Sequence, residues 1–124
     1  MSGRLDQIVF DCARAAPLAR FWAAVLDGYA VRPYDEAEIA RLAALGFTPD
    51  TDPVVMVDGP GPTLCFHEIA RGRTQGRLHL DVAVDDPAAA RDRLLSLGAT
   101  PVREADGYTV MADPEGNHFC LVGR

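Results

Sequence analysis

The chain has 124 residues, the length of one ordinary domain, and it can bury a hydrophobic core without disulfides or metal ions. Its net charge is −6, with 12 arginines, no lysine and no basic run, so nothing predicts binding to nucleic acid or to a membrane surface. Three widely spaced cysteines, the absence of a signal-peptide pattern and the absence of a membrane-length apolar run together predict a cytoplasmic protein.

The N-terminal part of the chain predicts a strand over 5–12 followed by a helix over 16–27. Pro17 stands where a helix begins and Gly28 where it ends. The apolar residues of this helix recur at positions i, i+3, i+4, i+7 and i+8, which is one stripe of an amphipathic helix. We expect this stripe to lie in the core; it consists of Leu18, Phe21, Trp22, Val25 and Leu26.

A second helix is predicted over 35–45, after a strand over 28–33, because the segment is rich in helix-forming residues and ends at Gly46. Strands are then predicted over 53–58 and 63–70. The Gly59-Pro60-Gly61-Pro62 stretch between them reads as a hairpin turn.

The C-terminal part of the chain follows a linker predicted at 71–76. Asp86 as N-cap and Pro87 at the first helical position predict a helix over 87–97. The remaining apolar runs predict strands over 77–84, 100–104, 107–113 and 117–123.

The sequence repeats itself. Residues 55–65 and 110–120 have Val, Met, Asp, Gly and Cys at matching places, five identities in eleven positions. We therefore predict one α+β domain over 1–124, built from two βαβββ modules by duplication. Module one spans about 4–70 and contains a helical insert over 35–49, and module two spans about 77–124.

Several segments resemble the glyoxalase-like branch of the vicinal-oxygen-chelate superfamily, which includes glyoxalase and bleomycin-resistance proteins. They are Leu5–Val9, Phe21-Trp22, Leu78–Pro87 and Asp113-Pro114-Glu115-Gly116-Asn117. The resemblance implies a curled mixed sheet around a small-molecule cleft. It also implies a homodimer, because members of this superfamily commonly pair their modules across a two-fold axis.

The resemblance further implies a divalent metal held by four residues that line the cleft. The matching positions here are Gln7, Cys65, His79 and Cys120. Metal-dependent relatives have Glu at the second and fourth of these positions, whereas this chain has Cys. Magnesium and manganese favour oxygen ligands, so we expect no tightly bound octahedral cation and no other cofactor. A softer ion such as zinc, held by Cys65, His79 and Cys120 with Gln7 as a weak fourth ligand, is the exception.

Strand alternation predicts which side chains face the cleft. If Ile8, Phe10, Phe66, Leu78, Leu80, Val82, Phe119 and Leu121 pack under the helices, the residues between them face the other way. Those residues include all three histidines, and the predicted cleft residues are Gln7, Cys65, His67, His79, Asp81, His118 and Cys120. Asp81 shares a face with His79 and is placed to orient or charge its imidazole. The simpler interpretation is that the histidines are structural, the cysteines are small apolar fillers and Asp81 pairs with Arg77 or is solvated.

Three functions fit these residues. The first is a metal-independent lyase or isomerase, in which His79 and Asp81 move a proton on a small carbonyl or hydroxylated substrate. The second is a non-catalytic protein that binds or sequesters a drug or metabolite, as bleomycin-resistance proteins do. The third is a soft-metal site. The fold is common to all three, so the sequence leaves open whether the chain is an enzyme.

Overall fold

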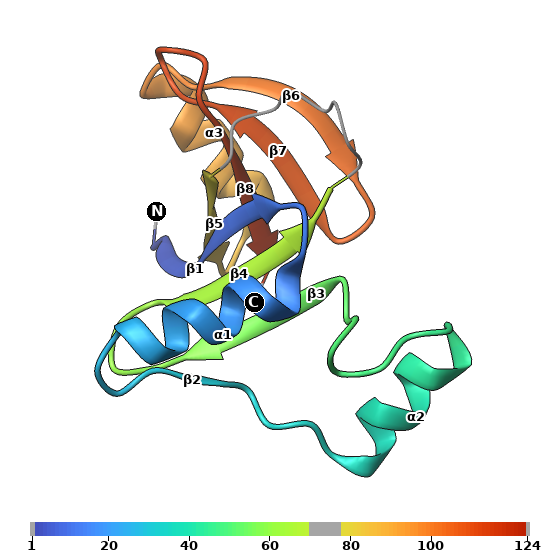
Figure 1. Cartoon of the computed structure of the whole chain (residues 1–124). Helices are drawn as coiled ribbons and strands as arrows, with labels where there is room; N and C mark the ends of the chain where they lie inside the picture. The colour runs from blue at the N-terminus through green and yellow to red at the C-terminus, as the bar shows by residue number, and fades with distance from the viewer. Residues whose placement is uncertain (1, 70–77, 124) are drawn as a thin grey trace. The chain divides into compact units, whose positions relative to one another are not determined.

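The computed structural model of the chain describes residues 2–69 and 78–123. It divides into two compact units, an N-terminal unit over Val9–Arg77 and a C-terminal unit that combines Met1–Ile8 with Leu78–Arg124. The first strand, β1 (Arg4–Cys12), contributes its first residues to the C-terminal unit and its last residues to the N-terminal unit. Figure 1 labels the helices and strands of both units.

The N-terminal unit contains a helix packed on a small sheet and a second, inserted helix (Figure 1). Its strands have the order β2-β3-β4-β1, with antiparallel pairing of β2 to β3 and of β3 to β4. Helix α1 packs against β2, β3 and β4. These elements are α1 (Ala15–Val25), β2 (Ala30–Val31), α2 (Glu36–Ala44), β3 (Val54–Asp58) and β4 (Thr63–Glu68).

The expectation that the apolar stripe of α1 lies in the core was wrong for Phe21, Trp22 and Val25, while Leu18 is half-buried. Phe21 and Val25 are 55% and 52% exposed, and Trp22 is also exposed, while the buried residues of the helix are Ala15, Ala16 and Ala19. Small side chains on the buried face let the helix backbone approach the sheet closely, so the larger residues lie on the outside. Phe21 and Trp22 contact each other there, edge to face, with ring centroids 5.2 Å apart.

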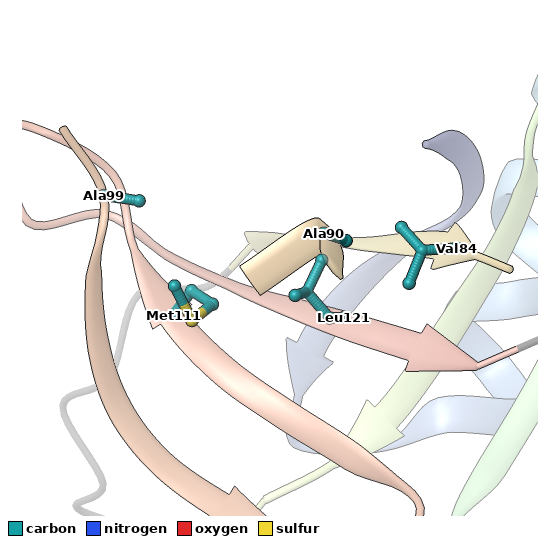
Figure 2. Close-up of a cluster of buried hydrophobic side chains, with 5 residues drawn as sticks. All are labelled: Val84, Ala90, Ala99, Met111 and Leu121. Carbon is teal, nitrogen blue, oxygen red and sulfur yellow. The ribbon is translucent and has the colours of Figure 1, made fainter. Parts of the chain in front are cut away.

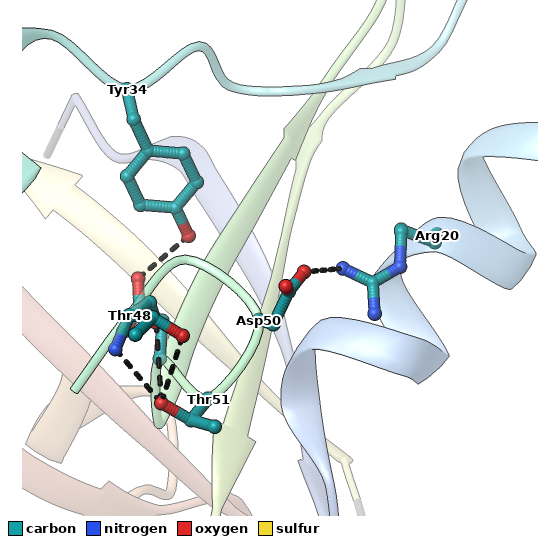
Figure 3. A network of polar contacts seen from close by, with 6 residues as sticks. Arg20, Tyr34, Thr48, Asp50 and Thr51 are labelled. Carbon is teal, nitrogen blue, oxygen red and sulfur yellow. Dashed lines mark hydrogen bonds and ion pairs between the residues drawn. The ribbon is translucent and has the colours of Figure 1, made fainter.

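The predicted insert is helical. Asp35 caps α2 by accepting a hydrogen bond from the backbone N–H of Glu38, 2.8 Å away. Leu42 is the buried side chain of this helix. The loop after the helix is held by polar contacts (Figure 3). The buried Asp52 carboxylate accepts hydrogen bonds from the Tyr34 hydroxyl at 2.7 Å and from the Val54 backbone N–H at 2.9 Å. Beside it, Thr51 and Thr48 bond to each other.

The turn between β3 and β4 packs on an aromatic ring. Tyr29 lies so close to this turn that a Cβ atom added at Gly59 would be 2.5 Å from the ring, and one added at Gly61 would be 2.6 Å from the hydroxyl. The Tyr29 hydroxyl donates a hydrogen bond to the Pro62 carbonyl at 3.0 Å. A side chain at Gly59 would collide with the ring itself, and one at Gly61 would displace the hydroxyl from its hydrogen bond.

The C-terminal unit repeats the arrangement of a helix on a sheet (Figure 1). Its strand order is β1-β5-β8-β7-β6, in which β5 and β8 are parallel while β8, β7 and β6 pair antiparallel. Helix α3 packs on β6 and β8. These elements are β5 (Leu78–Val84), α3 (Pro87–Ser96), β6 (Thr100–Ala105), β7 (Tyr108–Ala112) and β8 (His118–Gly123).

One cluster of apolar side chains joins α3 to this sheet (Figure 2). Met111 of β7 and Leu121 of β8 are its largest fully buried members, and Ala90 of α3 packs with them. Val82, Leu94 and Phe119 pack around the cluster and are partly buried. Asp86 caps α3 by accepting from the Ala89 N–H at 3.1 Å, with Pro87 at the predicted place.

The α+β fold and the order of two βαβββ segments are confirmed, with α2 inserted in the first. Predicted and observed elements agree within two residues at their ends. The largest difference is the strand predicted over 28–33, of which only Ala30–Val31 pairs with β3. The predicted linker at 71–76 lies outside the described residues.

The core of the C-terminal unit yields a test of this packing. Leu121 is 2% exposed, so Leu121→Ala should lower the free energy of unfolding by about 2–5 kcal/mol through lost burial and a residual cavity. Leu95 on α3 is 41% exposed, and Leu95→Ala should cost roughly 0.5 kcal/mol or less. Urea unfolding of both variants measures the difference; equal losses would contradict the cluster.

Candidate functional site

Three polar side chains of the C-terminal unit lie together on neighbouring strands. His79 and Asp81 are two residues apart on β5 and therefore share a face of that strand. Asp81 stands directly opposite Cys120 in the parallel pairing of β5 with β8. The imidazole nitrogen, carboxylate oxygen and thiol sulfur of these residues all lie within 4.8 Å of one another.

The apolar cluster explains which way these side chains face. Val82 and Val84 of β5, and Phe119 and Leu121 of β8, pack in or against the cluster that α3 covers. Because side chains alternate along a strand, the residues between them lie on the opposite face. The predicted alternation of β5 and β8 is therefore confirmed where the helix covers the sheet.

The same expectation was wrong at the start of β5. Leu78 and Leu80 were predicted to pack under a helix, but they are 52% and 40% exposed. The reason is the position of α3, whose contacts are with β6 and β8 and whose buried cluster includes only the Val82 and Val84 end of β5.

The turn before β8 fixes the register that brings Cys120 to Asp81. The Asp113 carboxylate accepts hydrogen bonds from the backbone N–H groups of Glu115 and Asn117, both at 2.9 Å, and from the Asn117 side-chain amide. These bonds hold the pKa of Asp113 below its ordinary value. Gly116 has a φ of +88°, a conformation that glycine adopts without strain. With this turn closed, Val110 of β7 pairs with Cys120 of β8.

The electrostatics of the group centre on His79. Its Nε2 atom lies 3.4 Å from Asp81 Oδ1, and the two side chains are 25% and 18% exposed. Hydrogen bonding to Asp81, and then to Cys120, raises the pKa of His79 to about 10, against the opposing effect of burial. His79 is therefore an imidazolium at neutral pH, so it acts as a hydrogen-bond donor or an acid rather than as a base.

The other predicted site residues are divided between the two units. Gln7 is half-buried in the part of β1 that belongs to the C-terminal unit, and it is not one of the three grouped donors. His118 lies in the same unit, exposed at the first position of β8 and opposite Ala112. Cys65 and His67 are on β4 in the N-terminal unit, where Cys65 is buried and stands opposite Met56.

His67 also lies beside an acidic side chain, a contact that the sequence analysis did not identify. Its Nδ1 atom is 3.9 Å from Oδ1 of Asp11 on β1. The rings of Phe10 and Phe66, the strand neighbours of Asp11 and His67, stack with centroids 5.1 Å apart. The His67 side chain is 50% exposed, so this pair is looser and more solvated than the pair of His79 and Asp81.

Two cavities lie elsewhere in the units. One of about 350 Å³ in the N-terminal unit is lined by residues that include Arg32, Tyr34, Arg41 and Asp52. One of about 270 Å³ in the C-terminal unit is lined by residues that include Glu104, Tyr108 and Leu121. Neither borders His79, Asp81 or Cys120, so the predicted lining of a ligand cleft by these residues stays a prediction.

The sequence matches the family model of the glyoxalase-like domain over residues 7–122. The chain belongs to the glyoxalase-like domain family. No curated protein has a significant sequence match to it. Among the residues that the structure describes, no helix is long and apolar enough to cross a membrane.

Solved structures share the fold of this glyoxalase-like chain at low sequence identity. A glyoxalase/bleomycin resistance protein/dioxygenase superfamily member from Vibrio splendidus 12B01 is 14% identical, with a TM-score of 0.60 over 99% of this chain and 100% of that one. A hypothetical protein from Bacillus halodurans C-125 is 12% identical, with a TM-score of 0.60 over 100% and 96%. An uncharacterized protein from Methanosarcina mazei is 12% identical, with a TM-score of 0.52 over 98% and 94%.

The residues at the family's metal positions do not fit a hard octahedral cation. Such an ion takes oxygen ligands, whereas two of the four positions here are the thiols of Cys65 and Cys120. The grouped donors His79, Asp81 and Cys120 supply one nitrogen, one carboxylate and one sulfur. This donor set suits a softer ion of the zinc type.

The raised pKa of His79 gives a pH-dependent test. Because the folded pKa of about 10 is above the ordinary histidine pKa of 6.5, the stabilisation from charged His79 is fully present below about pH 6.5 and is lost as the pH rises through 10. The imidazole NMR resonances of His79 should titrate near pH 10. Asp81→Asn should lower that midpoint by at least about one pH unit, which corresponds to about 1.4 kcal/mol of lost interaction with the charged imidazole. His118→Gln is the control and should leave the midpoint unchanged. A wild-type midpoint near 6.5 would contradict the contact.

Proposed function

We propose that this glyoxalase-like protein binds a small carbonyl or hydroxylated molecule against His79, Asp81 and Cys120 and moves a proton on it, as a lyase or isomerase that needs no hard metal ion. The contact of 3.4 Å between His79 and Asp81, with Cys120 in register beside them, supports this proposal. This arrangement places a cationic hydrogen-bond donor beside a carboxylate on one face of a sheet. Acid–base chemistry next to a carbonyl group needs one such acid and one such base.

The roles follow from the charges. The imidazolium of His79 has two N–H donors, one of which is available to a substrate carbonyl oxygen when the substrate displaces a partner. This hydrogen bond stabilises the negative charge that forms on the oxygen when the neighbouring C–H is deprotonated. Asp81 is the carboxylate within reach of that proton. Returning the proton to another carbon completes an isomerisation, and loss of a group from the adjacent carbon completes an elimination.

The surroundings of the group favour a small ligand. Val110 of β7 is buried and lies opposite Cys120, so the polar side chains border an apolar neighbour on the same face. Small-molecule sites commonly combine an apolar surface with a few placed polar groups.

We also propose that the protein works as a homodimer in the cytoplasm. Sedimentation at micromolar concentration tests the assembly: the mass of a dimer would support it, and the mass of one chain would contradict it.

Proton abstraction can be measured without knowing the natural substrate. Hydroxyacetone in D₂O, incubated with metal-depleted protein, should exchange its carbon-bound hydrogens next to the carbonyl, as followed by proton NMR. We expect Asp81→Asn and His79→Gln each to reduce the exchange above background by about 10²–10⁴-fold, the usual contribution of a positioned acid or base. Cys12→Ser should leave it unchanged.

The outcomes separate catalysis from binding. Exchange that persists in both Asp81→Asn and His79→Gln would overturn the assigned roles. Binding of a carbonyl compound without exchange would instead favour the non-catalytic function of the bleomycin-resistance type. Native mass spectrometry of the purified protein complements this test, because a retained small molecule would identify the ligand class directly.

A further inference from the structure

The cavity of about 350 Å³ in the N-terminal unit has the size of a small-molecule site. Most of its lining comes from residues 32–41, which follow β2 and enter α2, and the rest comes from Asp52, Val54 and Met56. Helix α2 is the insert of the first βαβββ segment. The second segment, described over residues 78–123, has no counterpart of this helix. The cavity is therefore particular to the first segment.

The cavity forms where the chain leaves the edge of the sheet. After the short strand β2, the Arg32 N–H bonds to the Met56 carbonyl at 2.9 Å, and beyond this bond the chain runs away from β3 into α2 (Figure 1). The next N–H along that edge of β3 belongs to Val54, and a carboxylate oxygen of Asp52 accepts it at 2.9 Å. Val54 is 39% exposed, so part of an apolar side chain stays open to a ligand.

The two arginines that line the cavity are already paired with carboxylates. Arg32 donates two hydrogen bonds to Asp58, at 2.7 and 2.9 Å, and Arg41 donates two to Glu38, at 2.6 and 3.2 Å. Hydrogen bonding to Glu38 raises the pKa of Arg41, and the charge of Asp52 adds a smaller effect, so Arg41 offsets the charge of Asp52 only in part. These paired guanidinium groups favour an anionic ligand much less than unpaired arginines would.

The other two carboxylates of the lining, Asp35 and Asp52, have no ion pair within the described part of the chain. Asp35 accepts the N–H of Glu38, and Asp52 accepts the Tyr34 hydroxyl and the Val54 N–H, all of which are uncharged donors. Asp52 is 4% exposed, so it has lost most of its contact with water without gaining a paired cation. A positive charge in the cavity would compensate for that loss.

We propose that this cavity binds a small organic cation, namely a protonated amine that carries an apolar group. Each carboxylate oxygen of Asp52 accepts one hydrogen bond and has capacity for another, which the ammonium group donates, while Asp35 adds a second negative charge. The apolar group contacts Val54 and Met56, and the Tyr34 ring adds attraction for the cation. The inference goes beyond the proposed function, because these residues belong to the N-terminal unit and none takes part in the proton transfer.

Benzylamine tests the site, because at neutral pH it is an ammonium ion attached to a small apolar ring. Titration of the full chain at about 0.15 M salt, which screens surface charges beyond about 8 Å, should give saturable NMR shifts of the Val54 N–H and the Met56 methyl group. Benzyl alcohol has a similar shape without the charge and should bind at least about 10-fold more weakly. No saturation below about 10 mM benzylamine, equal binding of benzyl alcohol, or binding of benzoate at these signals would each overturn the proposal.

Three variants that each remove one negative charge separate the cavity from the general acidity of the chain. Asp52→Asn should weaken benzylamine binding by at least about 10-fold. Asp35→Asn should weaken it by about threefold, the usual effect of an exposed ion pair, and it preserves α2 because asparagine caps a helix as well as aspartate does. Asp50→Asn is the matched control and should leave the affinity unchanged, because Asp50 lies in the same loop but pairs with Arg20 and does not line the cavity.

Wild-type affinity in both Asp35→Asn and Asp52→Asn, or a loss in Asp50→Asn as large as that in Asp35→Asn, would overturn the site. If Asp52→Asn does not fold, Asp35→Asn and the comparison of benzylamine with benzyl alcohol decide the matter. Asp35→Asn should also leave the hydroxyacetone exchange unchanged, so failure of this site and failure of the proposed acid–base function are distinguishable.

Discussion

The parallel pairing of β5 with β8 holds together both the core and the candidate site of the C-terminal unit. One face of these strands contributes Val84 and Leu121 to the apolar cluster under α3. On the other face Asp81 lies opposite Cys120, and His79 lies two residues before Asp81 on β5. A shift of one residue in this register would bury polar side chains and expose apolar ones. The energy of the core therefore also fixes the geometry of the polar group.

Within that group, one positive charge lies beside a carboxylate and a thiol. Burial alone would lower the pKa of an imidazole, but hydrogen bonds to Asp81 and Cys120 outweigh burial at His79. His67 of the N-terminal unit has a more distant carboxylate partner and a half-exposed ring. The two pairs of histidine and aspartate therefore differ in distance and burial, neither of which the composition of a strand reveals.

The predictable parts of this protein were those set by local sequence. Turn residues, the helix cap at Asp86 and strand alternation predicted the elements and their order. Packing between elements was harder to predict, as the exposed Phe21 on α1 demonstrates. The register in which strands pair was harder still to predict. Cys65 and Cys120 occupy matching repeat positions, yet Cys65 pairs with Met56 and Cys120 with Val110, which is the repeat equivalent of Val55. The register of the second hairpin therefore could not be derived from that of the first.

The ring of Tyr29 beneath the first hairpin turn has a consequence for how the two halves of the chain can diverge. A methyl group added at Gly59 would collide with the ring, and one added at Gly61 would displace its hydroxyl, so substitution at either position requires Tyr29 to move. In the second hairpin, Gly116 has open space around it and only its positive φ restricts replacement. In a library of random variants, accepted changes should therefore accumulate in the second turn, although the two turns occupy matching positions in the two similar segments of the sequence.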